Sequence, residues 1–103
     1  MSQQKESVQK SVKEVEEVID LFYQQKLQEA LNKFESVLGN MMIAIDALFT
    51  YKAENKEFQF DEIKLTNTLK DAMRALEEGD MVLLADILQY DYLEYMQELL
   101  NNM

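Results

Sequence analysis

The 103-residue sequence contains no histidine, cysteine, proline or tryptophan, and only two glycines. The lack of cysteine excludes disulfides, thiolate nucleophiles and zinc–thiolate sites. The lack of histidine removes the usual acid–base group at neutral pH and the commonest transition-metal ligand. Without proline and with so little glycine, long helices are favoured over a β fold with many turns. The length and the apolar fraction of 48% are typical of one globular domain, expected to span residues 1–103.

Basic side chains are also scarce. Ten lysines and arginines stand against twenty acidic residues, which gives a net charge of −10. This balance disfavours non-specific binding to nucleic acid or to an anionic membrane. No basic residue follows Arg74, whereas residues 75–103 hold seven acids. The acidic C-terminal part is either a solvated helix face or a docking face for a basic partner.

Long apolar runs are absent as well. The longest spans residues 41–49 and is interrupted by Asp46, well short of the roughly 18–20 residues that cross a bilayer. The first seven residues lack the apolar core of a signal peptide. We therefore expect a cytoplasmic protein with no membrane-spanning segment.

Apolar residues recur every three or four positions in four segments, which predicts an all-α fold. We expect a four-helix bundle built from two antiparallel helical hairpins, with helices at residues 5–23, 27–51, 61–78 and 81–101 and a polar connection at 52–60. On one continuous helix, the second apolar stripe would be rotated about the helix axis by roughly 120° from the first. A break near residues 23–26 lets both stripes face one core. Phe34 and Leu88 are among the expected core residues.

Helix-end signals support this division. Asp61 and Asp80 are candidate N-caps, since a carboxylate can accept hydrogen bonds from the free amides of a first turn. Phe60 and Leu65 have the spacing of a hydrophobic staple. Gly79 can take the left-handed backbone that ends a helix.

The two predicted hairpins share a pattern at an offset of 54 residues. Residues 15–22 align with 69–76, and the break at 25–26 aligns with Gly79 and Asp80. The apolar positions then show the same phase shift across turns of equal length. The pattern suggests two similar hairpins packed with approximate twofold symmetry. Any two amphipathic hairpins joined by equal turns would align in the same way, so duplication stays a hypothesis.

Residues 79–91, Gly-Asp-Met-Val-Leu-Leu-Ala-Asp-Ile-Leu-Gln-Tyr-Asp, resemble a signature of small uncharacterised helical proteins of Gram-positive bacteria. Gln89 and Asp91 stand where that family often has glutamate. The resemblance implies a helical fold and a bacterial cytosolic origin, and it carries no catalytic activity.

The sequence supports neither catalysis nor cofactor binding. Ser7 and Ser11, on a segment of surface character near Lys10, have no histidine to activate them. Carboxylate-bridged metal sites in helical bundles use Glu-x-x-His motifs, which this sequence lacks because it has no histidine. No stretch has the ligand spacing of a calcium-binding loop. Phosphate-binding loops are lacking because neither glycine lies in a glycine-rich turn. We expect no enzyme activity, no cofactor and no metal.

Apolar residues exceed what one core-facing stripe requires. In residues 81–101, Leu83, Ile87 and Tyr90 fall on a second side of the helix, and Ile43 and Ala47 lie beside the stripe of residues 27–51. Either these helices are central and more buried, or these five residues form an interface ringed by acids. Asp86 is expected to pair within the bundle, with a lysine or tyrosine, or to line that second side.

These features favour a protein that acts through protein–protein contacts, as an adaptor, regulator or chaperone-like binder. A homodimer is the simplest use of a second apolar side, since twofold self-complementary contacts are common. Two alternatives stay open: an acidic nucleic-acid mimic that inhibits a DNA-binding protein, and a sensor that holds a small ligand in an apolar pocket of the bundle.

Overall fold

The computed structural model describes residues 3–103, which form helices and no strand. Helix α1 spans Gln3–Tyr23, α2 spans Leu27–Glu54 and α3 spans Glu62–Glu78. The C-terminal helix is continuous and comprises α4 (Met81–Asp86), a π-helical segment η1 (Ile87–Leu93) and α5 (Glu94–Asn101). The prediction of an all-α bundle of four helices is confirmed.

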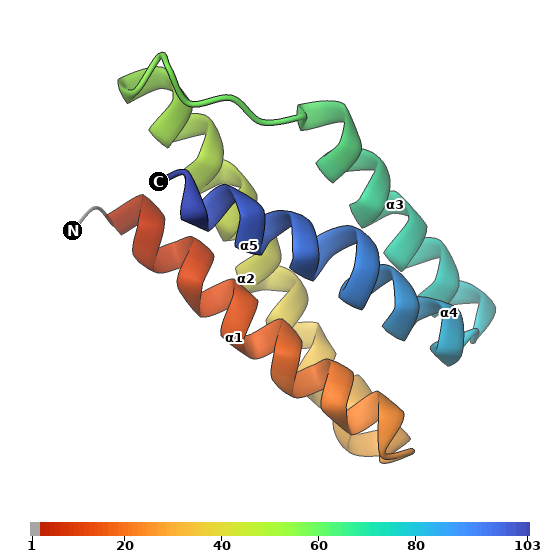
Figure 1. Ribbon diagram of the computed structural model, residues 1–103. Coiled ribbons are helices and arrows are strands. Elements are labelled where there is room, and N and C mark those ends of the chain that lie inside the picture. The colour runs from red at the N-terminus through yellow and green to blue at the C-terminus, as the bar shows by residue number, and fades with distance from the viewer. Residues whose placement is uncertain (1–2) are drawn as a thin grey trace.

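The helices form two antiparallel hairpins, α1 with α2 and α3 with the C-terminal helix (Figure 1). In this view the C-terminal helix lies between α1 and α3, and α2 passes behind it. Helix α1 packs closely against α2, α4, η1 and α5, whereas α3 packs closely against α4 and η1. Within residues 3–103, α2 and α3 do not approach each other closely over any appreciable length. The bundle is therefore open along the α2–α3 side.

Both hairpin turns have the same backbone geometry, 54 residues apart. Gln25 and Gly79 take left-handed conformations, with φ angles of 60° and 72°. In each turn the next amide donates to the carbonyl five residues back, at 3.0 and 2.9 Å, in the Schellman pattern that closes a helix. The offset seen in the sequence thus recurs in the structure. Gln25 takes the left-handed conformation in the first turn that Gly79 takes in the second, even though this conformation is unfavourable for most residues other than glycine.

The connection between α2 and α3 differs from the prediction. Helix α2 continues to Glu54, three residues beyond the expected end, because nothing in residues 52–54 breaks a helix and Asn55 caps it by donating its amide to Tyr51 at 2.8 Å. The rest of the connection is not merely polar, since Phe58 and Phe60 are buried. Their rings pack at 6.0 Å between centres.

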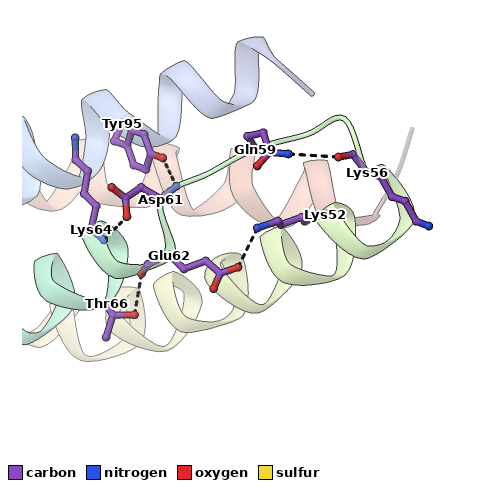
Figure 2. A network of polar contacts seen from close by, with 8 residues as sticks. All are labelled: Lys52, Lys56, Gln59, Asp61, Glu62, Lys64, Thr66 and Tyr95. Carbon is purple, nitrogen blue, oxygen red and sulfur yellow. Dashed lines mark hydrogen bonds and ion pairs between the residues drawn. The ribbon is translucent and has the colours of Figure 1, made fainter.

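Side-chain contacts then set the start of α3 (Figure 2). The Asp61 carboxylate accepts from the Lys64 amide at 2.9 Å, which confirms Asp61 as the N-cap. The Asp61 amide donates to the Tyr95 hydroxyl at 2.6 Å, tying this end of α3 to α5. Lys52 forms an ion pair with Glu62 at 3.2 Å across the connection.

The π-helical segment η1 changes which side of the C-terminal helix faces the core. Ile87 and Leu88 are buried, and so are Tyr92 and Leu93, five residues further on. Residues five apart lie on one side of a π-helix, whose hydrogen bonds run from i to i+5, but diverge by about 140° on an α-helix. The placement of Ile87 on a second, outward side was therefore wrong. That placement assumed α-helical periodicity throughout the segment.

A buried hydrogen bond joins α1 to η1. Ser11 is fully buried, contrary to the surface position expected, and its hydroxyl lies 2.7 Å from that of Tyr92. Burial raises the pKa of Tyr92 well above its ordinary value. The hydrogen bond with Ser11 lowers this pKa, but by less than burial raises it. Each hydroxyl is the hydrogen-bond partner of the other, which allows two polar groups inside an apolar core.

We expect Tyr92→Phe to cost about 1–3 kcal/mol at neutral pH, because it leaves the buried Ser11 hydroxyl unpaired. The double variant Tyr92→Phe with Ser11→Ala should recover part of this loss.

Because the unfolded chain releases the tyrosine proton near pH 10 and the folded chain retains it, the stability of the wild type should fall as the pH rises above about 10. Urea denaturation at neutral and alkaline pH measures both effects. An alkaline loss of the same size in the double variant would contradict the role of Tyr92.

Candidate functional site

A groove lies between the two hairpin turns, at the end of the bundle opposite the α2–α3 connection. Its volume is about 620 Å³, and both turns contribute to its walls. The lining residues are Phe22, Tyr23, Gln25, Leu27, Glu78, Gly79, Asp80, Met81, Val82 and Ala85. The matching turns therefore present one concave surface built from all four helices.

The helix ends explain why apolar side chains gather here. Gly79 ends α3, and Asp80 caps α4 by accepting from the Leu83 amide at 3.0 Å, as the sequence predicts. The first residues of α2 and α4, Leu27 and Met81, thereby follow directly after the turns and face the same space. They also correspond under the 54-residue offset.

Tyr23 and Asp86 connect the two hairpins beside the groove. The Tyr23 hydroxyl donates to the Asp86 carboxylate at 3.2 Å. Burial raises the pKa of the Tyr23 hydroxyl, and the hydrogen bond and charge of Asp86 raise it further. Asp86 therefore pairs within the fold with a tyrosine, one of the partners expected for it, and Tyr23 keeps its proton at neutral pH.

Large apolar side chains remain exposed at and around the groove. Val82 and Tyr90 on the C-terminal helix are 73% and 62% exposed, and Tyr23 and Leu27 are about half exposed. Clustered exposed apolar residues of this kind commonly mark interaction surfaces.

Acidic residues outnumber basic ones around the groove, where Lys26 of the first turn lies between the lining residues Gln25 and Leu27. The charged residues in its lining are Glu78 and Asp80, and Asp86 lies beside it. No lysine or arginine occurs in residues 75–103. The groove thus combines an apolar floor with an acidic edge.

The five residues predicted as an interface do not form one surface. Leu83 and Tyr90 are exposed near the groove, although neither lines it, whereas Ile87 is only 7% exposed and belongs to the core. Ile43 is 56% exposed and Ala47 is half-buried on α2, which packs closely against α1 and not against the C-terminal helix. The prediction omitted Tyr23 and Leu27. Both flank the turn at Gln25, which corresponds to the turn at Gly79 under the 54-residue offset, and this correspondence could have indicated them.

Residues 3–103 provide neither a cluster of metal ligands nor a membrane-spanning helix. That part of the chain holds no group of three or more histidine, cysteine, aspartate or glutamate side chains placed to hold a metal ion. None of its helices combines the length and the apolar character required to cross a membrane. Every buried side-chain nitrogen and oxygen there has a hydrogen-bond partner.

Comparison with known proteins places the chain in a family. Residues 1–102 match the family described as Domain of unknown function (DUF8042). No curated protein and no solved structure matches the chain. The match supports the part of the resemblance at residues 79–91 that pointed to uncharacterised proteins. Because the match covers almost the whole sequence, the chain belongs to the DUF8042 family.

Proposed function

We propose that the protein binds a partner protein in the groove between its hairpin turns, as an adaptor, regulator or chaperone-like binder. The partner segment is a basic amphipathic helix, and the setting is the cytoplasm of a bacterium, in keeping with the Gram-positive resemblance. We assign the protein no catalytic role, since the sequence lacks histidine and cysteine.

The observation that carries this proposal is the apolar groove with an acidic edge. A helix laid in such a groove buries its apolar side against Tyr23, Leu27 and Val82. Lysines or arginines on the flanks of that helix would lie near Glu78 and Asp80. Opposite charges at the edge of an interface speed association and favour the correct partner over others.

A second copy of the chain is a poor occupant for this groove. A twofold contact through the groove would bring Glu78, Asp80 and Asp86 against the same three residues of the other copy. Like charges facing each other across an interface are unfavourable. The homodimer favoured by the sequence therefore requires another surface.

Binding of a fluorescent, cationic amphipathic helical peptide tests the proposal. We expect saturable binding that weakens as salt is raised, and no binding of a peptide with the same apolar residues but acidic flanks. Val82→Lys, which introduces a positive charge at a highly exposed lining residue, should weaken binding by about tenfold or more. Ile43→Lys is the matched control, because Ile43 is exposed on α2 outside the groove. Equal loss in both variants, or equal binding of both peptides, would argue against the groove.

A small apolar ligand is the second candidate occupant. The groove volume of about 620 Å³ lies within the range of small-molecule sites. The thermal midpoint of the wild type in the presence of a library of apolar compounds tests this function. A rise in the thermal midpoint that Val82→Lys abolishes would favour the ligand sensor. An unchanged midpoint with every compound would favour peptide binding as the function of the groove.

A further inference from the structure

Helix α2 carries a second apolar stripe beside the one that faces the core. Leu31, Leu38 and Ile45 recur every seven residues and are partly buried. Met42 and Phe49 lie four residues after two of them and are 53% and 43% exposed. Repeats of seven and four place these residues along one side of the helix, as in the contact stripe of a coiled coil.

Helix α3 borders the same stripe. A pocket of about 340 Å³ lies between Phe49 of α2 and the first turns of α3, with Ile63, Thr66 and Lys70 on the α3 wall. Ile63 is 74% exposed. Because α2 and α3 are not closely packed against each other, this apolar surface is left open. We call it the α2–α3 face, defined by Leu38, Met42, Ile45, Phe49 and Ile63.

The two edges of the α2–α3 face carry opposite charges. On α2, Glu35 and Asp46 lie seven residues before and four residues after Met42, on the same side of the helix. On α3, Lys70 and Arg74 lie seven and eleven residues after Ile63 and share its side, with Glu77 at the end of the helix. All five charged residues are exposed, and none is ion-paired within residues 3–103.

We propose that the α2–α3 face binds a second copy of this chain in a twofold dimer. A twofold contact whose axis runs along the helices pairs the acidic edge of one copy with the basic edge of the other, so the face is complementary to itself in that orientation. The acidic groove lacks this property. The face is also distinct in position, since Met42 lies fifteen residues, or about 22 Å along α2, from Leu27 in the groove.

Sedimentation equilibrium measures this dimer directly. The wild type should sediment with twice the mass of the 12.1 kDa chain. Met42→Glu should raise the dimer dissociation constant by about tenfold or more, because it places a charge in the apolar contact. Ile43→Glu should leave the dissociation constant unchanged, since Ile43 is the adjacent residue, equally exposed, on another side of the helix. Circular dichroism verifies that both variants keep their helix content.

Charge reversal tests the edges. Asp46→Lys and Lys70→Glu should each weaken the dimer, and the two changes combined in one chain should restore it, since the contact between positions 46 and 70 then re-forms with its signs exchanged. Val82→Lys should leave the dimer intact, which separates this face from the groove. A wild type that is monomeric at every accessible concentration overturns the proposal, as does equal loss of the dimer in the Met42 and Ile43 variants.

Discussion

Replacing Ile87 with glutamate is expected to unfold the chain or to lower its free energy of unfolding by about 3–5 kcal/mol. Ile87 is only 7% exposed and faces the core from the π-helical segment. A carboxylate there would lose its hydration among apolar neighbours without a basic partner. Urea denaturation followed by circular dichroism measures the loss.

Leu83→Glu is the matched control for this change. Leu83 lies one turn earlier on the same helix and is 43% exposed, so we expect a loss of less than about 1 kcal/mol. Equal stability of the Ile87 and Leu83 variants would place Ile87 at the surface. It would also support the prediction, made from α-helical periodicity, that Ile87 belongs to an interface with Leu83 and Tyr90.

Truncation of the core should be nearly as damaging. We expect Phe34→Ala on α2 and Leu88→Ala in η1 each to lose about 2–5 kcal/mol, through the lost contacts and the cavity left behind. Both side chains are almost completely buried. Chemical denaturation measures the two losses, with the exposed Ile43 truncated to alanine as the control. A loss under about 0.5 kcal/mol at both positions would remove them from the core.

The helix boundaries were predictable because local chemistry determines them. Asp61 and Asp80 cap the helices that they were expected to cap, and Gly79 takes the left-handed conformation that ends α3. The first turn lacks glycine and proline, yet the phase change between apolar stripes located it to within a residue of Gln25. These signals lie within a few residues of the feature that they specify.

The groove was less predictable, because its walls meet only in the folded chain. The hydrogen bond from Tyr23 to Asp86 spans 63 residues, and no local pattern indicates it. The bond between Ser11 and Tyr92 spans 81 residues, and without it Ser11 looks like a surface residue. Ile87 was misplaced for another reason, since an apolar pattern does not distinguish π-helical from α-helical geometry in advance.

The two exposed apolar surfaces differ in the arrangement of their charges, and this difference is the reason why we propose different occupants for them. The charged residues that line the groove, Glu78 and Asp80, are both acidic, which suits a basic partner. The α2–α3 face has acids on one edge and bases on the other, which suits a second copy. Each proposal can therefore fail without the other.

Affinity capture from the source cells, with quantitative mass spectrometry, tests the proposed binding of a partner in the groove most directly. Wild type, Val82→Lys and Ile43→Lys are compared as bait. We predict a protein that is captured by wild type and Ile43→Lys, lost with Val82→Lys, and bound through a basic amphipathic helix whose isolated peptide competes for the groove. Capture of the same proteins in the same amounts by all three baits would contradict a binding function for the groove.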